Sequence, residues 1–250
     1  TVAGGLLDGR LPYRDLFDHK TPGIYALFAA VLAASGRSLL AVQMAQVTAV
    51  VSSAVLTGWL AGRMWGRRAG RLAALLALYG GAAYAGAHLT TEAWLALCTA
   101  AALLVLVGRR PATEPRPAAG LAAGALVGVS ALFKQTGLLT LGAFACWALL
   151  LPGGWRWSLR RWLWLLAGCS APLLLTGAWF AWQGALDELW RDAVLVNLSN
   201  YPPQGARTLL QANLLNLRAF PVLWLGLLAS LVLRPDLSQP TAARDLKAPA

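Results

Sequence analysis

The chain has 250 residues, of which 58% are hydrophobic and 12% are charged. Soluble domains carry about a quarter charged residues, so too few polar side chains remain here to coat a water-facing surface. The net charge of +11 does not indicate nucleic-acid binding, because the arginines gather in short clusters between long apolar runs. The composition therefore predicts an integral membrane protein, an all-α polytopic helical bundle.

The cysteines do not indicate a disulfide framework or a metal centre. Cys98, Cys146 and Cys169 are odd in number and scattered through apolar runs, where they are expected to serve as small packing residues. No cofactor is predicted with certainty. The carboxylates described below leave a divalent cation open, but no ligand spacing requires one.

Residues 1–38 are predicted to form an outer segment that contains a short helix. The apolar stretch 22–36 spans only ~22 Å at ~1.5 Å per residue, which is too short to cross a ~30 Å hydrocarbon core. We expect an interfacial helix capped by Thr21, with Pro22 at its first position. A short tilted span is the alternative.

About seven membrane spans are predicted next, because apolar runs close to ~20 residues recur along the chain. They lie at 39–62, 70–88, 91–108, 118–133, 136–151, 162–182 and 219–233. Arginine clusters separate them, and the positive-inside rule places each cluster in the cytoplasm. The clusters are Arg63, Arg67, Arg68 and Arg71; Arg109, Arg110 and Arg116; Arg156, Arg160 and Arg161; and Arg234, Arg244 and Lys247.

Because successive spans cross the membrane in opposite directions, four regions are predicted to lie outside, namely 1–38, 88–92, the turn at Lys134 and 183–218. The bundle thus runs over 39–233, and the polar residues 234–250 are predicted to be a cytoplasmic tail or linker. Within one span, glycines at every fourth position favour close approach of a neighbouring helix. They are Gly120, Gly124 and Gly128.

The second large outer region, 183–218, is predicted to contain two amphipathic stretches. The first has an apolar face and an opposite charged face. The apolar residues are Leu186, Leu189, Trp190 and Ala193, and the charged ones are Asp187, Glu188, Arg191 and Asp192. The second stretch, Arg207 to Arg218, follows a turn at Tyr201-Pro202-Pro203.

The strongest candidate site is a polar run in the first outer segment. Five charged or ionisable residues fall within seven positions: Arg14, Asp15, Asp18, His19 and Lys20. Carboxylates beside cations stay ionised and can act as bases or bind hydroxyl groups. Cations of this kind can hold a phosphate. The simpler interpretation is an ordinary charged loop.

Three further polar residues lie at the outer ends of predicted spans. His88 and Glu92 bracket one short turn, where Thr90 and Thr91 can cap the following helix and favour a negative charge in its first turn. Lys134 lies in a tight turn between short spans. It is expected either to extend its ammonium to the surface or to bind an anionic partner such as a lipid phosphate.

One stretch resembles a known family. The run Gly9-Arg-Leu-Pro-Tyr-Arg-Asp-Leu-Phe-Asp-His-Lys-Thr-Pro-Gly-Ile-Tyr25 resembles the first outer loop of polyprenyl-phosphate-dependent glycosyltransferases, the relatives of protein O-mannosyltransferases and aminoarabinose transferases. Thr21 replaces the first proline of their usual signature. Weaker similarities are Leu60 to Gly66, His88 to Glu92 and Leu132 to Gly137, so that the resemblance covers most of 1–182.

The resemblance implies the C-type glycosyltransferase fold and inverting sugar transfer from a polyprenyl-phosphate donor. In such enzymes an acidic residue after the first transmembrane helix is the base, and we expect it upstream of Thr1 together with a first span. Asp15 and Asp18 are second-choice catalytic residues. The expected substrate-binding residues are Tyr13, Arg14, His19, Lys20, His88, Glu92 and Lys134.

The resemblance also implies a multi-pass protein of the plasma or inner membrane that modifies a lipid, glycan or protein acceptor at the cell envelope. Two other classes remain open, a membrane transporter and a non-catalytic lipid-binding subunit. The transporter is less favoured because the span centres carry no ionisable residue. A nucleotide-sugar donor is disfavoured because no glycine-rich nucleotide loop is present.

Overall fold

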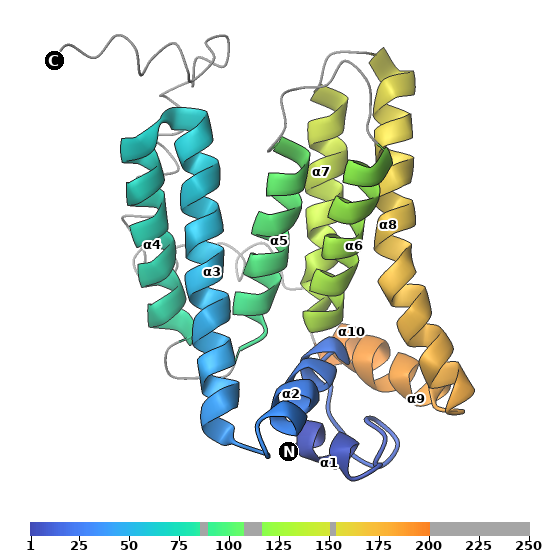
Figure 1. The fold of residues 1–250 in the computed structure, drawn as a ribbon. Helices are drawn as coiled ribbons and strands as arrows, with labels where there is room; N and C mark the ends of the chain where they lie inside the picture. Colours follow the sequence, from blue (N-terminus) through green and yellow to red (C-terminus); the bar gives the residue numbers. More distant parts are fainter. Residues whose placement is uncertain (86–89, 108–116, 151–153, 201–250) are drawn as a thin grey trace, which may run out of the picture.

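A computed structural model describes residues 1–85, 90–107, 117–150 and 154–200. All regular elements in these ranges are helical, as predicted, and the described residues contain no β-strand. The long helices run side by side, as Figure 1 shows. They are α3 (Leu39–Trp65), α4 (Arg67–Ala85), α5 (Glu92–Val107), α6 (Pro117–Phe133), α7 (Leu138–Leu150) and α8 (Gly154–Trp182).

The short helices gather at one end of this bundle, where α5 begins and α6 ends (Figure 1). They are α1 (Val2–Leu7), α2 (Gly23–Ala34), α9 (Leu186–Trp190), a π-helical turn η2 (Arg191–Leu195) and α10 (Val196–Asn200). A 3-10 turn, η1 (Gln135–Gly137), joins α6 to α7. The arginine-bearing junction of α3 and α4 lies at the opposite end. This matches the prediction that the arginine cluster after the first span and the segment 1–38 lie at opposite ends of the bundle. Which end faces the cytoplasm stays a prediction.

Two helical segments are long and apolar enough to cross a membrane, Leu39–Trp65 and Leu159–Trp182. Shorter apolar helices cover Gly23–Ala34, Glu92–Leu106 and Pro117–Phe133. The count of seven spans therefore stays a prediction. The predicted elements between 201 and 250, including the span 219–233, lie outside the described residues.

The face of α3 that other helices leave uncovered is mostly apolar, although Gln43 and Thr48 are exposed polar residues. Its large exposed apolar side chains recur every three or four residues, which marks one helical stripe. They include Leu40, Met44, Val47, Val51, Val55 and Trp59. An apolar stripe of this length is expected against hydrocarbon rather than water.

Helices α6 and α8 pack at backbone contact through glycine. A Cβ atom at Gly124 would lie 2.1 Å from the carbonyl oxygen of Leu165, and one at Gly128 would lie 2.4 Å from that of Cys169. On the facing helix, a Cβ at Gly168 would lie 2.1 Å from the Leu121 oxygen. The predicted role of the glycine repeat is thus confirmed.

The start of α2 differs from its prediction. Pro22 is the capping residue, no side chain caps the helix, and the buried Thr21 Oγ1 has no hydrogen-bond partner. The capping role predicted for Thr21 is therefore wrong. Packing fixes the helix instead, because Gly23 lies against the backbone of Leu132 at the end of α6, where a Cβ would come within 2.6 Å of its oxygen.

The predicted faces of the segment after α8 are also wrong at three positions. Asp192 is only 2% exposed, whereas Leu186 and Trp190 are 45% and 59% exposed. For Asp192 the reason is the π-helical turn at Arg191–Leu195, in which it lies. Its i→i+5 bonding widens the turn and rotates side chains away from the positions that an α-helical pattern assigns.

Candidate functional site

The candidate site is built on the loop between α1 and α2, and Tyr13 anchors that loop. Its side chain is buried, and its hydroxyl donates to the Lys20 carbonyl oxygen at 2.7 Å. Its ring packs against Tyr25 and Phe180, with centroids 6.4 and 5.6 Å away. Tyr13 has a φ of +72°, a strained conformation that only surrounding contacts can maintain.

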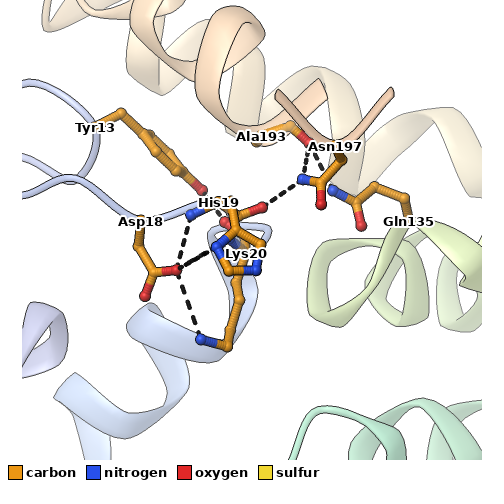
Figure 2. Close-up of polar contacts among 7 residues, drawn as sticks. All are labelled: Tyr13, Asp18, His19, Lys20, Gln135, Ala193 and Asn197. Carbon is orange, nitrogen blue, oxygen red and sulfur yellow. Dashed lines mark hydrogen bonds and ion pairs between the residues drawn. The ribbon is translucent and has the colours of Figure 1, made fainter. Parts of the chain in front are cut away.

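His19 and Lys20 both contact one carboxylate oxygen of Asp18 (Figure 2). Oδ1 of Asp18 accepts from the backbone N–H groups of His19 at 2.8 Å and Lys20 at 3.4 Å. The same oxygen lies 3.5 Å from Lys20 Nζ and 3.5 Å from His19 Nδ1. The Lys20 side chain remains 48% exposed, so its ammonium can still meet an anion from outside.

The environment of Asp18 keeps its carboxyl group ionised. Burial would raise the pKa, but the neighbouring Tyr25 hydroxyl, the Lys20 ammonium and two backbone amides outweigh it, so the pKa lies below its usual range. The buried Tyr25 hydroxyl lies close enough to Asp18 to stabilise its charge, although the two groups do not meet in regular hydrogen-bond geometry. Burial, and then the charges of Asp18 and Asp192, raise the pKa of Tyr13, so its hydroxyl stays a proton donor.

Arg14 and Asp15 fasten the loop rather than join the carboxylate cluster. Arg14 donates to the carbonyl oxygens of Gln183, at 3.1 Å, and of Gly184, and its Nε lies 3.6 Å from Glu188. Oδ2 of Asp15 accepts from the Leu11 backbone N–H at 2.7 Å. The roles in substrate contact and catalysis predicted for these two residues stay predictions.

Lys134 has an anionic partner, and it is a carboxylate of the protein. Its Nζ lies 2.5 Å from Oε1 of Glu92, which opens α5, and Thr91 donates to Oε2 at 3.3 Å. The structure thus joins two predicted site residues across 42 positions. The predicted turn residue His88 lies outside the described residues.

A buried amide that sequence reasoning missed holds the base of α5. Gln46 on α3 is 4% exposed and donates to both the carbonyl (3.0 Å) and the hydroxyl (3.3 Å) of Thr90. Its oxygen accepts from the Trp94 indole at 2.9 Å. Thr90 is therefore engaged with α3 through Gln46.

A second group that the sequence analysis missed is the Asn197 side chain on α10, which joins the two regions that were predicted to lie outside (Figure 2). Asn197 Nδ2 donates to the His19 carbonyl oxygen at 2.5 Å and to that of Ala193 at 3.1 Å. Gln135, next to Lys134, donates to the same Ala193 oxygen at 2.6 Å. The one sequence signal at this position is the triplet Asn197-Leu198-Ser199, a glycosylation-type pattern too short to use.

The arrangement offers cations and ionised carboxylates at the end of an apolar bundle. Within the described ranges, no three His, Cys, Asp or Glu side chains are grouped closely enough to hold a metal ion. What the site can do chemically is bind an anion through Lys20 and orient or deprotonate a hydroxyl group through a carboxylate.

In the described residues, long apolar helices with the candidate site at the end where the short helices gather are typical of a helical membrane protein. Residues 19–182 match the dolichyl-phosphate-mannose-protein mannosyltransferase family, and the chain belongs to this family of membrane glycosyltransferases. The matched range begins at His19 and includes Lys20, Glu92 and Lys134. No curated protein and no solved structure matches the chain.

Proposed function

We propose that the protein transfers a sugar from a polyprenyl-phosphate donor to an acceptor hydroxyl at the outer face of the membrane, with inversion. The observation that carries the proposal is the placement of Lys20. Its ammonium is about half exposed, lies 3.5 Å from the ionised Asp18 and is held at the end of the apolar bundle by the Tyr13 bond to its carbonyl. Family membership supports the same reaction class.

The donor's physical character fits this site. A polyprenyl-phosphate sugar keeps its phosphate at the membrane surface and its tail in the hydrocarbon, so its site needs cations at the bundle end beside apolar surface. Lys20 meets that need, and Lys134 supplies a second cation if it leaves Glu92. Cations at this position also stabilise the charge that develops on the departing phosphate.

The step is a single displacement at the anomeric carbon. The acceptor oxygen forms the new bond, the bond from carbon to the phosphate oxygen breaks, and the electron pair leaves with the lipid phosphate. The acceptor proton passes to a carboxylate base. Because its pKa is lowered, Asp18 suits orientation of the acceptor and of Lys20 better than proton abstraction.

The test is donor dependence in membranes that carry the protein. Lys20→Gln should raise the donor KM by about 10- to 100-fold, the contribution of a hydrogen bond to a charged group. Arg10→Gln is the matched control, because it removes one positive charge from the same exposed segment outside the carboxylate cluster. An unchanged donor KM in Lys20→Gln, with normal membrane insertion, would contradict the proposal.

A further inference from the structure

The contact between Asn197 and His19 joins two segments that are 178 residues apart. Both N–H groups of the Asn197 amide are used, one on the His19 carbonyl and one on the Ala193 carbonyl. The second bond lies within the helical turn of Asn197 itself, whereas the first reaches the loop that carries Lys20 (Figure 2).

The His19 carbonyl belongs to the same peptide group as the Lys20 N–H. One side of that peptide is fixed by Asn197, and the other side donates to Asp18 at 3.4 Å. The following carbonyl, that of Lys20, accepts from Tyr13 at 2.7 Å. The backbone on both sides of the Lys20 Cα atom is therefore held by side chains, which fixes the direction of its Cα–Cβ bond, and the ion pair with Asp18 at 3.5 Å places the ammonium at the end of the side chain.

The carbonyl group that holds Asn197 in place also binds the residue next to Lys134, the second cation of the site. The Ala193 oxygen accepts from Asn197 and from Gln135, the residue after Lys134. The π-helical turn thus links the Lys20 loop to the turn of Lys134 through one carbonyl group. Such π turns occur frequently at functional sites.

We infer that Asn197 is a positioning residue, which orients the Lys20 ammonium toward the donor phosphate through the His19 carbonyl. The inference rests on the proposed function and deepens it. A side-chain amide at this place cannot be replaced by a carboxylate, because the site needs two donors and a carboxylate offers none. This use also leaves no N–H free for glycosylation at the Asn197-Leu198-Ser199 triplet.

The experiment compares three substitutions by their separate effects on donor and acceptor kinetics. Asn197→Asp keeps the shape and removes both donors. Asn197→Ser removes the bond to His19 but keeps a hydroxyl that can donate to the Ala193 carbonyl, four residues earlier. Ser35 makes the equivalent bond to the Val31 carbonyl at 2.7 Å. Ser199→Ala is the matched control, because it destroys the triplet without touching the amide bonds.

Both Asn197 variants should raise the donor KM by about three- to tenfold, the contribution of one hydrogen bond, with kcat and acceptor KM unchanged. In a Lys20→Gln background the same substitutions should have no further effect, because Asn197 acts through Lys20. Ser199→Ala should match the wild type.

An unchanged donor KM in Asn197→Ser, an additive effect in the Lys20→Gln background, or an equal effect of Ser199→Ala would each overturn the positioning role. These results all require that the wild type uses the lipid-linked donor. Wild-type protein that inserts normally but transfers no sugar would instead remove the proposed function, and this inference with it.

Discussion

Gly124 lies where α6 and α8 come closest, and its replacement by alanine should weaken the bundle. The new Cβ would lie 2.1 Å from the Leu165 carbonyl oxygen and 2.9 Å from the Cys169 nitrogen. Both are backbone atoms that cannot rotate away. The two helices must separate by about 1 Å to restore an ordinary contact, and overpacking of this kind costs about 3 kcal/mol at the upper end of its usual range.

Alanine also gains about 1 kcal/mol of helix propensity over glycine, so the net loss in unfolding free energy should be about 2 kcal/mol. Gly177 on α8 is the matched control, because a Cβ there meets no atom within 4 Å. Gly177→Ala should be neutral or stabilising by up to about 1 kcal/mol.

Reversible unfolding in mixed micelles, titrated with a denaturing detergent, measures both variants against the wild type. Because α6 ends next to Lys134, the Gly124→Ala protein should also lose transfer activity before it unfolds. Equal stability of Gly124→Ala and Gly177→Ala would refute the close contact between α6 and α8.

Two further predictions concern the charged pairs. Glu92→Gln should lower the unfolding free energy by about 0.5–1 kcal/mol, and this value is small because the Glu92 and Lys134 side chains are each about a third exposed. A double-mutant cycle with Lys134→Met that shows no coupling energy would contradict the ion pair between Glu92 and Lys134. The pKa of Asp18 is lowered, so its stabilising effect is present above the unfolded value near 3.8 and is lost as pH falls through the folded value. Melting temperatures of wild type and Asp18→Asn should therefore differ at neutral pH and converge below about pH 3.8; a gap that widens on acidification would contradict the lowered pKa.

Hydropathy and glycine spacing predicted the long helices because these features are local. Helix α3 and the predicted span 39–62 begin at the same residue, and α6 and the span 118–133 end at the same residue. Helix α8, however, begins at Gly154 rather than at 162. An apolar run marks the part suited to hydrocarbon, whereas backbone hydrogen bonds continue into the polar flank.

The site was only partly predictable because long-range contacts define it. Spacing grouped Asp18, His19 and Lys20, which are neighbours in the chain. The pairing of Glu92 with Lys134 and the bond of Asn197 to His19 depend on how distant segments pack, and no local pattern encodes them. The same holds for Gln46, because no local pattern marks it rather than Gln43 as the buried glutamine of α3, and for the short helix α1, which was not predicted.

The most direct measurement is sugar transfer by the purified protein in vesicles, with the label carried either on a polyprenyl-phosphate sugar or on the matching nucleotide sugar. We expect label to reach the acceptor from the polyprenyl-phosphate donor and none from the nucleotide sugar, with the product in the inverted anomeric configuration. Transfer from the nucleotide sugar alone, or from neither donor while labelled sugar crosses the vesicle membrane, would contradict the account.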